Sequence, residues 1–190
     1  YFILPYTIGT YLSKEIGTKK TDLDQKEFLK AEKKAKENIT ELIENKGKES
    51  VESFHKKLGD IMWKYCGMER NKKGLIKALE ELKILKKEFK NNVIVPGNKS
   101  ELNQELEKAG RVDDFIGLGE VMIHDALKRE ESCGGHFREE FQSEEGEALR
   151  NDEEYAYVSA WEYLGDKNDP KLNKEKLAFK NVKLTQRSYK

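Results

Sequence analysis

Cysteine is scarce in this sequence of 190 residues, and Cys66 and Cys133 are its only two. They lie far apart and form no CxxC motif, so they provide neither a disulfide framework nor the ligand spacing of a zinc site. We therefore expect no bound metal and a reducing, cytoplasmic setting. Cys133 lies three residues before His136. A thiol nucleophile and its histidine are normally brought together by the fold rather than by one turn, so a catalytic pair is not favoured.

Neither sign of charge is in excess, because 36 lysines and arginines balance 36 aspartates and glutamates. Such a balance gives no general attraction to the phosphates of nucleic acid or to an anionic membrane, so we expect no nucleic-acid partner. No apolar run approaches the roughly 20 residues that a membrane span needs. The phosphate-binding motifs GxGxxG and GxxxxGKS are also missing, and the sequence predicts no cofactor site of its own.

An initiator methionine is missing too: the sequence opens with Tyr-Phe-Ile-Leu, and its first methionine is Met62. No basic segment precedes this apolar opening, which is therefore unlike a signal peptide. We expect an interior stretch of a longer chain. A short helix is predicted for residues 5–16, because Pro5 suits a first helical turn and Gly17 suits a helix end. This helix is expected to pack on a part of the protein that lies upstream.

Amphipathic helix is abundant in the sequence. In four further segments apolar residues recur at steps of three and four, and each segment opens with a residue that can cap a helix. The segments are residues 24–47, 50–67, 71–92 and 100–131, opened by Asp24, Ser50, Asn71 and Ser100. A bend in the last of them is expected near Gly110. Short connections between such helices predict an all-α fold, an up-and-down three- to four-helix bundle like a spectrin repeat.

The character of the sequence changes after residue 132. Residues 133–150 are rich in glycine and glutamate and are predicted to form a loop. Residues 155–164 and 176–184 have strand-like composition and are separated by turn-forming residues. They predict a small C-terminal β extension of two strands. Because a two-stranded ribbon is marginal by itself, we expect it to lean on the bundle or on another domain.

The segment from Arg129 to Glu140 has the densest set of functional residue types. It joins a helix end, the glycine pair Gly134-Gly135, and a histidine and an arginine, His136 and Arg138, two residues apart. Two interpretations stay open from the residues alone. The glycines can end a helix while His136 and Arg138 pair with neighbouring acids, or the loop can carry a function, as polar loops often do.

Several segments together resemble the C-terminal region of the succinate dehydrogenase and fumarate reductase flavoproteins. Residues Glu131–Glu140 are similar to the family signature Glu-Ser-Arg-Gly-x-His-x-Arg, with Cys133 where arginine is commoner. The form found here resembles the variant in subunits with a one-protein dihaem or related membrane anchor. The other similar segments are Tyr1–Gly9, Met62–Met68, Ala109–Phe115, Asp125–Glu130 and Leu184–Lys190.

The resemblance implies a subunit that interconverts succinate and fumarate through FAD. It implies an FAD-binding domain upstream and electron transfer to an iron–sulfur subunit, with indirect contact to a membrane-anchor cytochrome. The complex would lie peripherally on the cytoplasmic side of the inner membrane. The family's flavin-linking and dicarboxylate-binding residues lie upstream, so this stretch alone is expected to hold no FAD and no catalytic residue. The residues assigned an interface or structural role are Glu131, His136, Arg138, Arg187 and Tyr189.

The resemblance also implies a division of the chain. Residues 1–20 would end the FAD-binding domain, residues 21–132 would form the helical bundle, and residues 133–190 would form the loop, the β extension and the tail. Two alternatives remain: the equivalent helical domain of an L-aspartate oxidase or adenylylsulfate reductase, and a free-standing helical interaction module. The Cys-Gly-Gly-His-Phe-Arg form of the signature and the Arg-Ser-Tyr tail argue against the first alternative.

Overall fold

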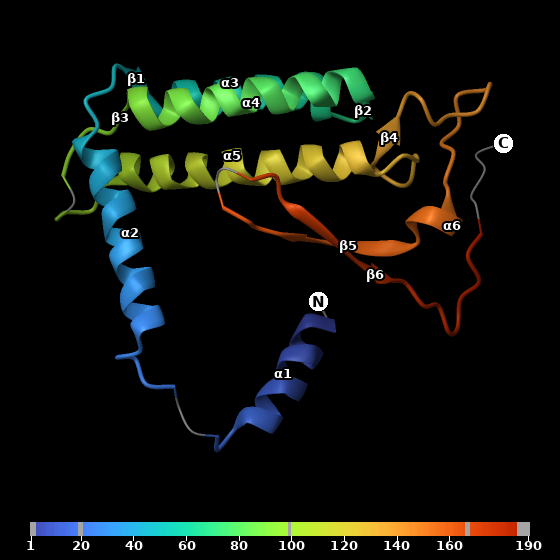
Figure 1. The fold of residues 1–190 in the computed structure, drawn as a ribbon, viewed down its shortest axis with the longest axis horizontal. Helices are drawn as coiled ribbons and strands as arrows, with labels where there is room; N and C mark the ends of the chain where they lie inside the picture. Colours follow the sequence, from blue (N-terminus) through green and yellow to red (C-terminus); the bar gives the residue numbers. More distant parts are fainter. Residues whose placement is uncertain (1–2, 19–20, 99, 166–167, 186–190) are drawn as a thin grey trace. The chain divides into compact units, whose positions relative to one another are not determined.

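A computed structural model describes residues 3–18, 21–98, 100–165 and 168–185 (Figure 1). The chain divides into two compact units, Tyr1–Asn38 and Ile39–Lys190. This division falls inside the second helix, whereas the domain boundary at residues 20 and 21 stays a prediction. None of the helices in the described ranges is long and apolar enough to cross a membrane.

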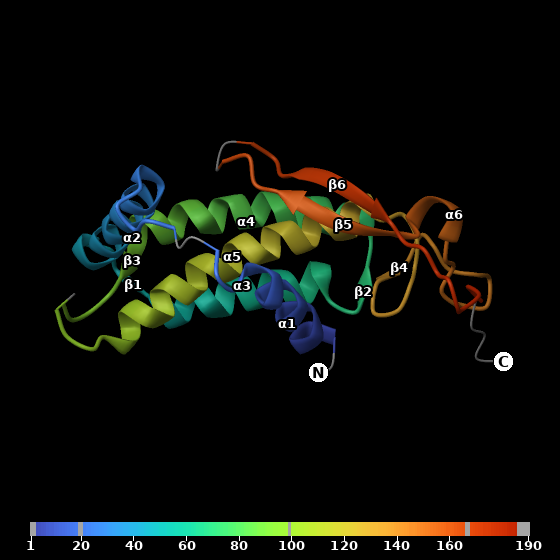
Figure 2. The same cartoon turned by 90° about the horizontal axis from the view of Figure 1, so that it is seen from below.

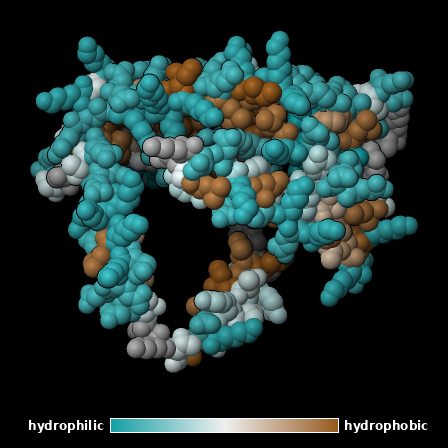
Figure 3. Space-filling model, viewed as in Figure 1, coloured by the Kyte–Doolittle hydropathy of each residue, from teal (hydrophilic) through white to brown (hydrophobic). Residues whose placement is uncertain are grey.

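The first unit holds α1 (Ile3–Glu15) and the first part of α2 (Lys26–Glu44). The predicted helix at residues 5–16 is therefore present and starts two residues earlier. Neither helix buries a side chain, although α1 is apolar along much of its length. Figure 3 shows hydrophobic side chains gathered on the surface of α1. An apolar helix without a buried face needs another surface to cover it.

The second unit is built on a three-helix bundle of α3 (Val51–Cys66), α4 (Lys72–Asn92) and α5 (Gln104–Lys128), which lie side by side in Figures 1 and 2. The end of α2 adds Leu42 and Ile43 to the edge of the core. The predicted apolar stripes supply most of the large, fully buried apolar side chains, which include Phe54, Leu75, Leu82, Phe89, Ile116 and Ile123. The predicted all-α bundle with a small β extension is confirmed.

Of the four predicted helix caps, Ser50 and Asn71 are confirmed and Ser100 is wrong. Asp24 does not directly precede its helix, because α2 begins at Lys26. Ser50 accepts a hydrogen bond from the Ser53 amide at 3.3 Å, and Asn71 accepts one from the Gly74 amide at 2.7 Å. For α5 the cap is Asn103 rather than Ser100. The reason is that the Asn103 side chain also donates to the carbonyls of Pro96 and Asn98, which fixes the turn, whereas the Ser100 hydroxyl bonds to Asn98. The helix is continuous past Gly110.

Two short parallel pairs tie the ends of the bundle together, and neither was predicted. β1 (Glu49–Ser50) pairs with β3 (Val93–Ile94), and β2 (Glu69–Arg70) pairs with β4 (Phe137–Arg138). Each joins segments more than 40 residues apart in the sequence, with only two residues in each strand. Segments this short carry no detectable alternation, so only the packing of the helices brings them into register.

After a short helix α6 (Asp152–Tyr155), an antiparallel ribbon joins β5 (Tyr157–Glu162) to β6 (Lys171–Lys176). The first strand lies where it was predicted. The second was predicted at residues 176–184, and this is wrong, because the ribbon register pairs Tyr157 with Lys176 and Trp161 with Leu172. Eight residues, 163–170, separate the two strands, and the pairing context outweighs the strand preference of the residues themselves. The polar segment Lys171–Lys176 is thereby the strand, and the apolar residues after it lie beyond the ladder.

Candidate functional site

The segment Glu131–Glu140 forms a tight turn just beyond the C-terminal end of α5. The Cys133 amide donates to the His136 carbonyl at 2.8 Å, and the His136 amide donates back to the Cys133 carbonyl at 3.0 Å. Gly134 has a φ of +59°, a region that glycine enters at little cost. The thiol of Cys133 is exposed. The buried Ser132 hydroxyl also spans the turn: it accepts from the Arg138 amide at 2.8 Å and donates to the Arg138 carbonyl at 3.2 Å. Backbone bonds and this one hydroxyl therefore close the turn.

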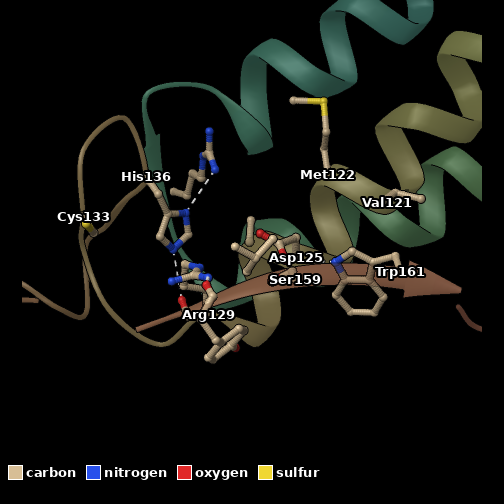
Figure 4. Close-up of a pocket in the computed structure, with 12 residues that line it drawn as sticks. Val121, Met122, Asp125, Arg129, Cys133, His136, Ser159 and Trp161 are labelled. Carbon is tan, nitrogen blue, oxygen red and sulfur yellow. Dashed lines mark hydrogen bonds between the residues drawn. The ribbon is translucent and has the colours of Figure 1, made fainter. Parts of the chain in front are cut away.

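The imidazole of His136 bridges two arginines (Figure 4). Its Nδ1 lies 3.1 Å from Nη1 of Arg70, and its Nε2 lies 3.0 Å from the carbonyl oxygen of Arg129. Because a guanidinium only donates, Nδ1 is the acceptor and Nε2 carries the proton that is donated to Arg129. Burial lowers the pKa of His136. The hydrogen bond to the Arg129 carbonyl acts to raise this pKa, whereas the charges of Arg70, Arg138 and Arg129 lower it further. His136 is thus held as the neutral imidazole.

Arg138 is the most deeply placed charged side chain of the turn, with 1% of its surface exposed. Its Nη1 donates to the carbonyls of Ala126 at 2.9 Å and Leu127 at 3.4 Å, in the last turn of α5. Carbonyls in a last helical turn have no partner within the helix, and a cation there also interacts favourably with the helix dipole. Nε of Arg138 donates to Glu140 at 3.0 Å. Arg138 is therefore engaged within its own domain.

Glu139 and Glu140 connect the turn to the start of α4. Glu140 accepts a hydrogen bond from the Lys72 amide at 2.6 Å, and Glu139 accepts one from Nδ2 of Asn71 at 2.7 Å. Burial acts to raise the pKa of Glu140, but the Lys72 amide and the Arg138 guanidinium outweigh it, so that its pKa is lowered. A carboxylate at a helix N-terminus satisfies amides that otherwise lack partners.

Glu131 and Arg129 fasten the other side of the turn. The Glu131 carboxylate has 3% exposure; it lies 2.8 Å from Nη1 of Arg129 and accepts from the Asn151 amide at 2.9 Å. The Arg129 guanidinium also donates to the carbonyl of Tyr157 at 3.3 Å and lies 4.9 Å from the centre of the Tyr157 ring. This pair connects the end of α5 to the first strand of the ribbon.

A pocket of about 520 Å³ lies between this turn, α5 and β5 (Figure 4). Its lining includes Arg70 and His136 at one end, and Met122, Trp161 and Ser159 elsewhere. Nε1 of Trp161 donates to Asp125 on α5 at 2.9 Å, which fixes the ribbon against the bundle. Among the side chains that the structure describes, no group of three or more His, Cys, Asp and Glu residues is placed to hold a metal.

Of the two residues expected to pair with neighbouring acids, Arg138 does so with Glu140. His136 does not, because its ring contacts Arg70 and the Arg129 carbonyl instead. Glu131 and His136 are linked through Arg129, which both of them contact. Arg187 and Tyr189 lie outside the described residues. Sequence reasoning missed Arg70 and Trp161 as members of the site. Arg70 follows the motif Met62–Met68 by two residues, and that proximity was the available signal.

A family described as "Fumarate reductase flavoprotein C-term" matches residues 55–189, which include all of the site described above. The chain belongs to this family. Among curated relatives, the fumarate reductase flavoprotein subunit of Helicobacter pylori (strain ATCC 700392 / 26695) is 28% identical over 144 residues, covering 76% of this chain and 20% of that protein. The chain thus spans about a fifth of the length of this relative.

Solved structures share the fold of this family member. A quinol fumarate reductase from E. coli matches with a TM-score of 0.74 and 19% identity, over 92% of this chain and 28% of that one. Adenylylsulfate reductase from Archaeoglobus fulgidus matches with a TM-score of 0.63 and 18% identity, over 84% of this chain and 26% of that one. At such identities the likeness concerns the fold alone, and it extends to a reductase of a different named activity.

Proposed function

We propose that this chain is the C-terminal, non-catalytic domain of a flavoprotein subunit that interconverts succinate and fumarate. The match of residues 55–189 to the fumarate reductase flavoprotein C-terminal family carries this proposal. FAD would be bound by a domain upstream of the chain, and the catalytic residues would lie there too. Electrons would pass to an iron–sulfur subunit, with a membrane-anchor cytochrome as an indirect partner, in a complex peripheral to the cytoplasmic side of the inner membrane.

The exposed apolar surface of α1 supports a covalent neighbour of this kind. Ile3, Leu4, Tyr6 and Ile16 each have more than two thirds of their surface exposed. We propose that residues 1–20 complete the FAD-binding domain, that residues 21–132 form the helical domain, and that residues 133–190 form its extension. Burial of α1 against the upstream domain would remove from water the apolar area that the chain leaves exposed.

We propose a structural role for Glu131, His136 and Arg138 toward that neighbour. Their internal hydrogen bonds hold the turn in one shape, and the exposed residues Cys133, Gly134 and Gly135 at its tip are then presented to the FAD-binding domain. Arg187 and Tyr189 of the tail are proposed to add to the same contact. Rigid presentation lowers the entropy lost when two domains dock.

The test uses the intact subunit with its upstream sequence. FAD content and fumarate reduction by a reduced viologen are measured for the subunit and for residues 1–190 alone. Bound flavin and fumarate reduction by the intact subunit, with neither in residues 1–190, are the expected results. An intact subunit that binds flavin but oxidises L-aspartate, or reduces adenylylsulfate, instead of reducing fumarate would assign the chain to one of those flavoenzymes. Flavin bound by residues 1–190 alone would contradict the non-catalytic role.

The role of the turn is tested in the same subunit with Arg138→Ala. Lower FAD content and a lower unfolding temperature are expected, because the turn loses its anchor on α5. Unchanged flavin content and stability would reject the role of Arg138. Arg111→Ala is the matched control, because Arg111 pairs with Glu107 on the exposed surface of α5, the helix that Arg138 binds.

A further inference from the structure

Arg70 differs from every other arginine in the described part of the chain, because it has no carboxylate partner. The remaining four each form an ion pair, and the pairs are Arg111–Glu107, Arg129–Glu131, Arg138–Glu140 and Arg150–Asp152. Arg70 instead donates from Nε to the Gly67 carbonyl at 2.7 Å and from Nη1 to His136 at 3.1 Å. Both acceptors are neutral, and no carboxylate of the described residues forms an ion pair with this half-buried guanidinium.

An unbalanced, partly buried cation favours an anion beside it, since charge taken out of water is unfavourable without a partner. A guanidinium has five N–H donors, and the contacts to Gly67 and His136 use two of them. Arg70 therefore retains donors for a ligand in the pocket that it lines. Arginine suits a carboxylate in particular, because its planar fork can donate two parallel hydrogen bonds to the two oxygens.

The rest of the pocket suits an apolar body. Val121, Met122 and Trp161 contribute to its wall, and its volume of about 520 Å³ lies in the range of small-molecule sites. Ser159 also lines the pocket, and its hydroxyl oxygen is buried with no hydrogen-bond partner among the described residues. Buried hydroxyls normally have a partner, so this orphaned group indicates a place for a polar atom of a ligand.

Asp125 limits the charge that the pocket accepts. Asp125 lines the pocket, and Oδ1 of its carboxylate accepts a hydrogen bond from the indole N–H of Trp161. A second anionic group on the ligand would be repelled by this carboxylate. The imidazole of His136 is neutral and does not offset it. The pocket therefore favours a ligand with one negative charge over a dianion.

We propose that the pocket between α5, β5 and the turn binds an aromatic monocarboxylate, with Arg70 as the partner of its carboxylate. The ring lies against Met122 and Trp161, and the Ser159 hydroxyl donates to the ligand. This site uses no flavin, and one residue of its lining, Cys133, also belongs to the tip of the turn that is proposed to contact the FAD-binding domain. Ligand binding by the 190-residue chain requires neither flavin nor fumarate reduction, so its test is independent of the proposed enzyme activity.

The first test measures the affinity of the 190-residue chain for 2-naphthoate by isothermal titration calorimetry. Its neutral analogue 2-naphthamide and the dianion succinate serve as comparison probes. We expect 2-naphthoate to bind at least tenfold more tightly than either. An amide that binds as tightly as the acid, or a chain that binds none of the three, would overturn the proposal. This comparison needs no variant and is independent of any effect on folding.

The second test uses Arg70→Gln with Arg111→Gln as the matched control. Each removes one positive charge, but Arg111 lies on the exposed surface, away from the pocket. Arg70→Gln is expected to weaken 2-naphthoate binding at least tenfold, and Arg111→Gln to leave it unchanged. Equal affinity in Arg70→Gln and the unaltered chain would reject the site. Ser159→Ala, which breaks no hydrogen bond of the described chain, is expected to weaken binding severalfold, and unchanged affinity there would reject the hydroxyl as a ligand contact.

Discussion

Arg138 and Glu140 form an ion pair whose two members cap the ends of different helices. The guanidinium binds the last carbonyls of α5, the carboxylate binds the first amide of α4, and the two side chains meet at 3.0 Å. Each member thus satisfies backbone groups that its helix leaves without partners. The pair connects the C-terminus of one bundle helix to the N-terminus of another through two residues of a single turn.

Replacement of Arg138 by methionine is expected to lower the free energy of unfolding by about 3 kcal/mol or more, because it leaves buried carbonyls of α5 without a donor. Arg138→Lys keeps the positive charge but replaces the planar guanidinium by one ammonium. Its free energy of unfolding is therefore expected to fall less than that of Arg138→Met. Urea denaturation followed by circular dichroism measures both. Arg111→Met is the control, since an exposed pair contributes about 0.5 kcal/mol or less. A loss in Arg138→Met no larger than in that control would contradict the capping role.

Acidification is expected to destabilise the chain through His136. Burial lowers the pKa of this histidine in the folded state relative to the ordinary value of 6.5, so the unfolded chain binds a proton first as the pH falls. Above pH 6.5 the full stabilisation by the neutral imidazole is present. As the pH falls from 6.5 toward the lowered pKa of the folded state, this stabilisation is progressively lost. A protonated ring would also lose the Arg70 hydrogen bond and face the guanidinium charges of Arg70, Arg129 and Arg138.

The measurement is the free energy of unfolding between about pH 5 and pH 7. His136→Gln is expected to reduce the dependence on pH, and the exposed His55→Gln is the control for loss of a histidine. His124, buried on α5, has a pKa that is lowered chiefly by burial, so the double variant with His124→Gln should flatten the dependence further. An unaltered pH dependence in His136→Gln would show that this imidazole is not held neutral by the fold.

Gly47 lies where no side chain fits. A Cβ atom at this position would overlap the backbone carbonyl of Asn92, which cannot move because it accepts the Lys48 amide at 3.0 Å. Gly47→Ala is therefore expected to lower stability by about 3 kcal/mol or more. Gly59 on the exposed side of α3 has open space around it, and Gly59→Ala is expected to raise stability by about 0.5–1 kcal/mol. Thermal unfolding of the two variants compares them, and a shift of the same sign in both would contradict this account.

The β5–β6 ribbon depends on its contacts with α5. Without the indole proton that Trp161 donates to Asp125, the ribbon is expected to open more often, because two strands alone are marginal. Hydrogen exchange of the β5 and β6 amides should therefore accelerate in Trp161→Phe, while exchange in the core of α4 stays slow. Trp63→Phe is the matched control, since Trp63 is 85% exposed. Equal exchange in the two variants would show that another contact holds the ribbon.

The amphipathic helices could be predicted because their information is local. The apolar stripes through Phe54, Leu75 and Leu82 repeat at helical spacing. Ser50 and Asn71 each cap a helix by accepting a hydrogen bond from an amide three residues further along the chain. The cap of α5 could not be read in this way. Ser100 and Asn103 are both suitable residue types, and the choice of Asn103 depends on the carbonyls that the preceding loop turns toward it.

The position of the second strand of the ribbon also could not be predicted from local sequence. The composition of residues 176–184 favours a strand, yet the ladder uses Lys171–Lys176, which pairs with the strand that Trp161 anchors on α5. Intrinsic strand preference differs by about 1 kcal/mol between residues, and the pairing context outweighs it. The two-residue pairs of β2 with β4 and of β1 with β3 depend wholly on which helix ends the bundle places together.

The sequence by itself determined the helical bundle, the turn at Glu131–Glu140 and, through its motifs, the family. Only the tertiary structure decided what the side chains of that turn contact. Arg138 reaches the carbonyls of α5, and His136 meets Arg70 across 66 positions of sequence. Periodicity and capping are set by residues within one or two helical turns, whereas ion pairing and burial depend on distances that the packing of separate helices creates.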